Sequence, residues 1–209
     1  MPVDRPPLHR DVPAVAPEQR AAQHLAFIRE TMAQSATFTA VPGWGVVAMG
    51  VIGLLGMGYD LTTPHFSTLA WLLTAVTAGG VGGAALYRKA VQLGVPLASG
   101  AGRKYVLGLV PALLAGACLT WAVGRLPEPA YVSATVNLLP GLWLLLYGVA
   151  LLTAGMFSVP VIPAVGTGFM ALAVVAFLVP PLWQVLLLGL GFGGLHLVLG
   201  LYIVRRYGG

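Results

Sequence analysis

Charged residues are scarce in this chain. Of its 209 residues, 8% are charged, with 11 Lys and Arg against 6 Asp and Glu, whereas a soluble domain has about 25%. So few charges do not cover a soluble globule of this length, and a hydrophobic content of 58% excludes a disordered chain. A single cysteine, Cys118, excludes a disulfide scaffold. A multi-pass membrane protein remains.

Six apolar segments are long enough to cross a hydrocarbon core, which takes about 20 residues. None of them contains Asp, Glu, Lys or Arg away from its ends. We therefore predict an all-α polytopic membrane protein whose six transmembrane helices fill 37–204. The spans are expected near 37–59, 66–87, 105–124, 131–155, 163–180 and 184–204.

The N-terminal segment does not resemble a signal peptide, because residues 1–17 contain prolines and charges but no apolar stretch. We expect a disordered cytoplasmic tail over 1–16. Apolar residues then recur at helical spacing at Ala21, Leu25, Ile28 and Met32. This spacing favours a short amphipathic helix over 17–34 that lies on the membrane surface. The alternative is a helix that simply extends the first span.

The basic residues of the loops predict the orientation. With six spans, the N-terminal segment, the loop after the second span and the cytoplasmic tail over 205–209 share one side and carry ten Lys and Arg residues. The other side has only Arg125. The positive-inside rule therefore places both termini in the cytoplasm. Because the basic residues flank apolar runs and Arg outnumbers Lys, we expect a bacterial inner-membrane protein and no nucleic-acid partner.

An internal repeat relates the first and fourth spans. At an offset of 98 residues and without a gap, nine identities occur between 30 and 54, including Glu, Ser-Ala-Thr and Pro-Gly. The third and sixth spans align more weakly at an offset of 81, where Gly108-Leu109 meets Gly189-Leu190. Three spans per half would insert the second half upside down, so we predict a 3+3 inverted repeat, as in many transporters.

The two repeated Pro-Gly pairs, Pro42-Gly43 and Pro140-Gly141, lie inside predicted spans. A proline within a helix frees the carbonyl four residues earlier, which in lipid needs a partner or a water-lined cavity. Hydroxyl side chains nearby in the sequence are expected to donate hydrogen bonds that relieve the strained turns. The pairs are either tolerated kinks or hinges that line a path. The candidate hinge or path-lining residues are Ser35, Thr37, Pro42, Gly43, Ser133, Thr135, Asn137, Pro140, Gly141 and His196.

His196 is a titratable side chain well inside a span, which makes it a functional candidate by position. No Cys, Asp, Glu or second His is available in the predicted core to complete a metal site. We therefore expect no metal and no cofactor here, and a hydrogen bond from His196 to a neighbouring helix.

Several catalytic and transport signatures are missing. The fourth span has no Gly-x-Ser-Gly of rhomboid proteases, Asn137 is not part of an Asn-Pro-Ala motif of aquaporins, and no phosphate-binding loop occurs. We expect a protein that is not an enzyme but an accessory, sensory or assembly subunit, with the lipid bilayer and other membrane subunits as partners. The alternative is a small uncoupled transporter or channel built on the inverted repeat.

One stretch resembles a family. The residues Phe27-Ile28-Arg29-Glu30-Thr31-Met32 and Ser35-Ala36-Thr37-Phe38-Thr39-Ala40-Val41-Pro42-Gly43-Trp44-Gly45 resemble a pattern in multi-pass membrane proteins of unknown function from acidobacteria. The resemblance covers about 20 residues. It implies a bacterial membrane location and carries no activity.

The charge distribution generates a test of orientation. Reporter fusions at Gly209 and within the Asp60–His65 loop should report opposite compartments, with the C-terminal fusion cytoplasmic. Topology-dependent phosphatase and fluorescent-protein reporters measure this. A C-terminus outside the cytoplasm would overturn the number of spans or the orientation.

Overall fold

The computed structural model describes residues 17–35, 37–98 and 100–208, and over these ranges it is all-helical apart from an isolated bridge between Phe38 and Ser158. The predicted all-α class is thereby confirmed. The tail expected over 1–16 lies outside the described residues. The chain divides into two units, Met1–Ser35 and Ala36–Gly209, which are considered separately.

The first unit contains helix α1 (Pro17–Ser35), where the sequence predicts a helix over 17–34. Pro17 opens the helix, at a position where its missing N–H has no intrahelical partner to lose. Leu25, Phe27 and Ile28 are exposed. A non-helical segment over 37–42 follows α1, so α1 is not an extension of the first predicted span.

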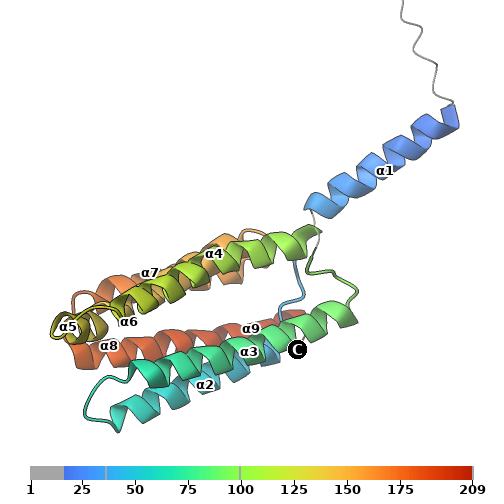
Figure 1. Ribbon diagram of the computed structural model, residues 1–209. Helices are drawn as coiled ribbons and strands as arrows, with labels where there is room; N and C mark the ends of the chain where they lie inside the picture. Colours follow the sequence, from blue (N-terminus) through green and yellow to red (C-terminus); the bar gives the residue numbers. More distant parts are fainter. Residues whose placement is uncertain (1–16, 36, 99, 209) are drawn as a thin grey trace, which may run out of the picture. The chain divides into compact units, whose positions relative to one another are not determined.

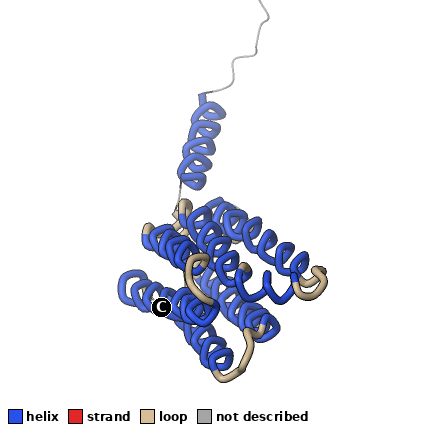
Figure 2. Tube along the Cα trace, turned by 90° about the vertical axis from the view of Figure 1, so that its left-hand side faces the viewer, coloured by secondary structure: helices blue, strands red, loops and turns tan. Residues whose placement is uncertain are grey.

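The second unit is a bundle of helices in two layers (Figure 1). One layer holds α2 (Gly43–Leu61), α3 (Thr68–Gln92), α8 (Pro181–Leu188), the π-helical segment η1 (Gly189–Leu195) and α9 (His196–Tyr207). The other holds α4 (Gly100–Val123), α5 (Ala130–Asn137), α6 (Leu139–Gly155) and α7 (Val161–Ala176). The end-on view in Figure 2 shows the helices running alongside one another.

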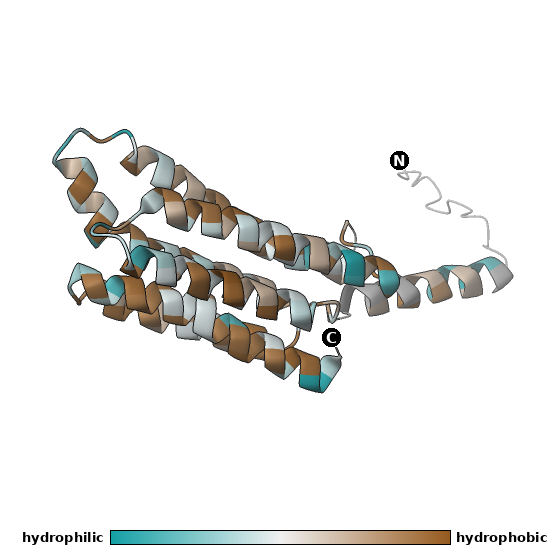
Figure 3. Ribbon diagram, turned by 90° about the horizontal axis from the view of Figure 1, so that it is seen from below, coloured by the Kyte–Doolittle hydropathy of each residue, from teal (hydrophilic) through white to brown (hydrophobic). Residues whose placement is uncertain are grey.

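Four of these helical segments are long and apolar enough to cross a membrane: α2, α3, α4 and the continuous stretch Pro181–Tyr207. The pair α5 and α6 makes a fifth if it counts as one bent span, and α7 is shorter, with 16 residues. Hydrophobic residues predominate along the helices and hydrophilic ones gather toward the ends, as Figure 3 shows. The chain therefore has the character of an integral membrane protein.

The two Pro-Gly pairs both lie at the start of a helix. Pro42 precedes α2 in an extended conformation, with φ −82° and ψ 106°, so the prediction of a span that begins at 37 and is kinked at Pro42 is wrong. The fourth predicted span is broken, because α5 and α6 meet at 47° next to Pro140. Proline is tolerated in the first turn of a helix and disrupts its interior, which explains both positions.

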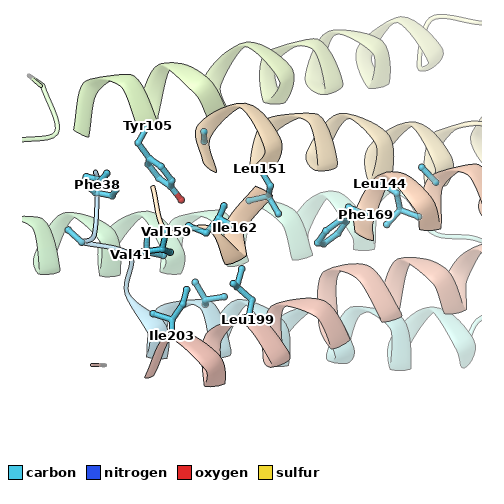
Figure 4. Packing of buried hydrophobic residues seen from close by; sticks show 14 of the residues in the cluster. Phe38, Val41, Tyr105, Leu144, Leu151, Val159, Ile162, Phe169, Leu199 and Ile203 are labelled. Atoms are coloured by element: carbon cyan, nitrogen blue, oxygen red, sulfur yellow. The ribbon is translucent and has the colours of Figure 1, made fainter. Parts of the chain in front are cut away.

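The segment before α2 is fixed by residues far away in the sequence. Phe38 is fully buried and stacks on Tyr105 of α4, with ring centroids 4.8 Å apart (Figure 4). Its N–H donates to the Phe157 carbonyl at 2.7 Å, and the Ser158 hydroxyl donates to the Phe38 carbonyl at 2.6 Å. The Phe38 carbonyl, four residues before Pro42, is thus satisfied by Ser158 from the α6–α7 loop.

Glycine allows α2 to approach the last helix closely. A Cβ atom at Gly50 would lie 2.8 Å from the Leu197 nitrogen and 2.9 Å from the Gly193 oxygen. On the opposite helix, a Cβ at Gly200 would lie 2.6 Å from the Val47 nitrogen. Since these neighbours are backbone atoms, a larger side chain would push the two helices apart. This small-residue contact is the kind by which membrane helices associate.

Gly50→Ala should therefore destabilise the bundle relative to Gly80→Ala, whose Cβ would have open space around it. Both changes gain the same helix propensity, so the difference isolates the clash. We expect a difference of about 1–3 kcal/mol in the free energy of unfolding, which is the range for overpacked sites. Denaturation in detergent, followed by circular dichroism, measures it. Equal stabilities would show that the α2–α9 contact is not tight.

Candidate functional site

A cavity of about 600 Å³ lies between the two layers. Its walls come from α2, α3, α4, α6 and the η1–α9 stretch. Among the described helices, α3 packs against α2 and α4 packs against α6, whereas α3 and α4 do not pack against each other along their length. We call this cavity, lined on α3 from Trp71 to Leu86 and on α4 from Tyr105 to Thr120, the α3–α4 cleft.

Small and aliphatic side chains dominate the walls of the α3–α4 cleft. The small residues are Ala75, Ala78, Gly79, Gly82 and Gly83 on α3, and Ala112, Gly116 and Ala117 on α4. No Asp, Glu, Lys or Arg occurs among the described residues that line the cleft. The cleft is therefore suited to an apolar occupant, since ligand sites of this size depend on apolar contact area with a few polar groups.

The wall of the cleft contains one buried polar pair. The Tyr147 hydroxyl lies 2.7 Å from Nε2 of His196, which confirms the predicted bond from His196 to a neighbouring helix. The ring of His196 also lies against Phe169 and Phe192, with centroids 5.5 and 6.3 Å away. His196 directly follows η1, and π-helical turns often occur at functional sites.

Most other polar atoms of the walls are satisfied within the protein. Nε1 of Trp143 donates to the Thr120 hydroxyl at 2.8 Å, and that hydroxyl donates to the Gly116 carbonyl at 2.8 Å. The Thr74 hydroxyl donates to its own helix, at the Ala70 carbonyl. Nε1 of Trp71 is buried without a partner in the described part of the chain. These bonds leave the surface of the cleft chemically close to hydrocarbon.

The structure does not gather the predicted hinge and path residues into one site. Pro42 and His196 line the α3–α4 cleft. Thr37 is exposed, and Asn137 is exposed and donates to the Ser133 carbonyl at 2.9 Å. The side chain of Ser35 lies outside the described part of the chain. The other candidate residues do not line the cleft: Gly43, Thr135, Pro140 and Gly141 are buried, and Ser133 is exposed.

Sequence reasoning missed the residues that surround His196 and the buried carboxylate near the end of α2. Tyr147, the partner of His196, lies 49 residues before it on α6, and its only sequence signal is a hydroxyl in the middle of an apolar run. Asp60 lies in the last turn of α2 and not in the loop expected at Asp60–His65, and in this buried position its Oδ1 accepts from the Ser67 N–H at 2.8 Å. This bond ties the end of α2 to the start of α3.

Basic residues concentrate at one end of the bundle. Six of the seven Lys and Arg residues between 37 and 208 lie at the C-terminal end of α3, the N-terminal end of α4 or the C-terminal end of α9. Nζ of Lys89 donates to the Val41 carbonyl at 3.1 Å and to the Gly208 carbonyl at 2.9 Å. Lys104 lies over the ring of Phe157, at 5.7 Å.

Over the described residues, no three His, Cys, Asp or Glu side chains gather in a way that could hold a metal ion. No known protein family, curated protein or solved structure matches this chain.

The Tyr147–His196 pair should couple α6 energetically to α9. In a double-mutant cycle of Tyr147→Phe and His196→Leu, we expect a coupling free energy of about 0.6–1.7 kcal/mol, as for other hydrogen bonds between membrane helices. Unfolding in detergent measures the four stabilities. Tyr202→Phe, on the exposed side of α9, serves as the control and should change little. Additive effects of the two substitutions would mean that the pair contributes no stability.

Proposed function

We propose that this chain is a non-catalytic six-span protein of a bacterial inner membrane, where it serves as an accessory, sensory or assembly subunit of a membrane complex. The spans are α2, α3, α4, α5–α6, α7 and α8–α9. At 1.5 Å per residue α7 is about 24 Å long, and bilayers accommodate a mismatch of a few ångströms. The basic end of the bundle supports cytoplasmic termini.

The exposure of α3 carries the proposal. This helix has 25 residues, yet only 6% of its most apolar window is buried, and it is held by α2 along one side. Thr77, Gly80 and Ala84 recur at helical spacing and are exposed. Nothing lies within 4 Å of the Cβ position of Gly80. Small residues let membrane helices pack closely, so this face of α3 suits a transmembrane helix of a partner protein.

The face with Thr77, Gly80 and Ala84 is centred away from the α3–α4 cleft. At 3.6 residues per turn, Thr77 and Ala84 point away from the lining residues, whereas Gly80 lies beside Val76 and Gly83 at the edge of the cleft. A substitution at Ala84 therefore alters the partner face without entering the cleft.

The alternative function, a small uncoupled transporter built on an inverted repeat, is favoured by the packing of the two halves. The third helix of each half packs on the first helix of the other: α4 on α6, and α9 on α2. A Cβ at Gly108 would approach Ala154, and a Cβ at Gly189 would approach Met57. With offsets of 81 and 98 residues, these two contacts correspond within one position, as an inverted repeat requires.

Two features weigh against transport as the main function. Thr37, Thr135, Asn137 and Pro140 do not line a common path. The cavity that does exist is apolar and open between α3 and α4, which favours lateral binding in the bilayer over passage of a polar solute.

Assembly and solute flux test the proposal together. In native cells, the tagged chain should migrate in mild detergent as a complex larger than the monomer, and Gly80→Leu should release it from that complex. Gly58→Leu is the matched control, because its Cβ position on α2 also has open space. Liposomes that contain the purified chain should swell in glycerol and in potassium chloride at the same rate as protein-free liposomes.

A monomer in native membranes, with Gly80→Leu and Gly58→Leu indistinguishable from wild type, would refute the subunit function. Swelling faster than in protein-free liposomes would instead support the transporter.

A further inference from the structure

The α3–α4 cleft is long and narrow. Its lining extends over 16 residues of α3, from Trp71 to Leu86, and over 16 residues of α4, from Tyr105 to Thr120. At 1.5 Å per residue each wall is about 22 Å long, which is roughly three-quarters of a hydrocarbon core of about 30 Å. The cleft therefore runs along the membrane normal when α3 and α4 span the bilayer.

The dimensions and lining of the cleft suit a hydrocarbon chain. Its volume of about 600 Å³ is distributed along walls that are about 22 Å long. The apolar walls described above match such a chain, because they offer dispersion contacts and few free hydrogen-bonding groups.

Two cations continue the walls of the cleft at the basic end. Lys89 lies three residues beyond Leu86 on α3, and Arg103 lies three residues before Val106 on α4, so both share the face that lines the cleft. Two donors of the Lys89 ammonium are used by the Val41 and Gly208 carbonyls, and an ammonium has three. Arg103 is exposed.

We propose that the α3–α4 cleft binds one anionic phospholipid, with an acyl chain between α3 and α4 and its phosphate at Lys89 and Arg103. Basic groups between transmembrane helices on the cytoplasmic side are suited to anionic headgroups. The lipid fills the space that α3 and α4 leave open and joins the two layers of the bundle. This inference goes beyond the role as a subunit, since the partner helix would use the other face of α3.

Lipid binding to the purified full-length chain tests the site. Native mass spectrometry should show one dioleoyl phosphatidylglycerol bound more tightly than dioleoyl phosphatidylcholine. Gly79→Leu places a side chain in the cleft, where its Cβ has open space. It should weaken the binding of both lipids at least tenfold. Ala84→Leu, on the partner face of α3 and off the cleft, should bind both lipids like wild type. Ala117→Leu, on the α4 wall, provides a second cleft-filling variant if Gly79→Leu does not fold.

The headgroup contact has its own pair of variants. Arg103→Gln should weaken the binding of phosphatidylglycerol by about fivefold, the factor expected for one cation near an anionic headgroup. The affinity for phosphatidylcholine should stay unchanged. Arg206→Gln, at the same end of the bundle but on α9, should bind both lipids like wild type. Equal effects of the two arginine substitutions would mean that only the overall basic charge attracts the lipid.

Wild-type lipid affinities in both Gly79→Leu and Ala117→Leu would overturn the proposal and leave only lipid bound around the outer surface. Dimers that disappear in Gly79→Leu, without any retained lipid in the wild type, would assign the cleft to a second copy. Ala84→Leu distinguishes this proposal from the subunit function, because it alters the partner face and spares the cleft.

Discussion

The glycine-mediated contact between α2 and the η1–α9 stretch is the constraint on which the bundle depends. Gly50 and Gly200 bring two backbones together at distances that no larger side chain allows. This contact holds the last helix of the chain against the first span, and it places His196 opposite Tyr147 of the other layer. In lipid, where apolar burial gives little net driving force between helices, such close packing and a few hydrogen bonds supply the association energy.

A second consequence of this arrangement is an imbalance between the halves of the chain. In the second half, α7 packs along α6 and also contacts α8, η1 and α9. In the first half, α3 packs along α2 and leaves α4 to the opposite layer. The α3–α4 cleft and the exposed face of α3 both result from this difference. The bundle therefore has one open side, and the proposed binding in the membrane takes place on that side.

The sequence predicts the features that depend on local composition. Apolar runs indicate the helices, and the lone histidine among them predicts a bond between helices. The start of α2 could not be predicted locally, because Phe38 is held outside the helix by Phe157 and Ser158, about 120 residues later. The partner of His196 was missed for the same reason. The cleft exists because α3 and α4 do not pack against each other, and no sequence pattern along either helix predicts that missing contact.

The most direct measurement is a structure of the full-length chain in a nanodisc that contains phosphatidylglycerol and phosphatidylcholine. The account predicts one elongated, unbranched density between α3 and α4, with its polar end at Lys89 and Arg103. It would be contradicted by α3 packed directly on α4 with no cavity between them, or by a protein helix in that position.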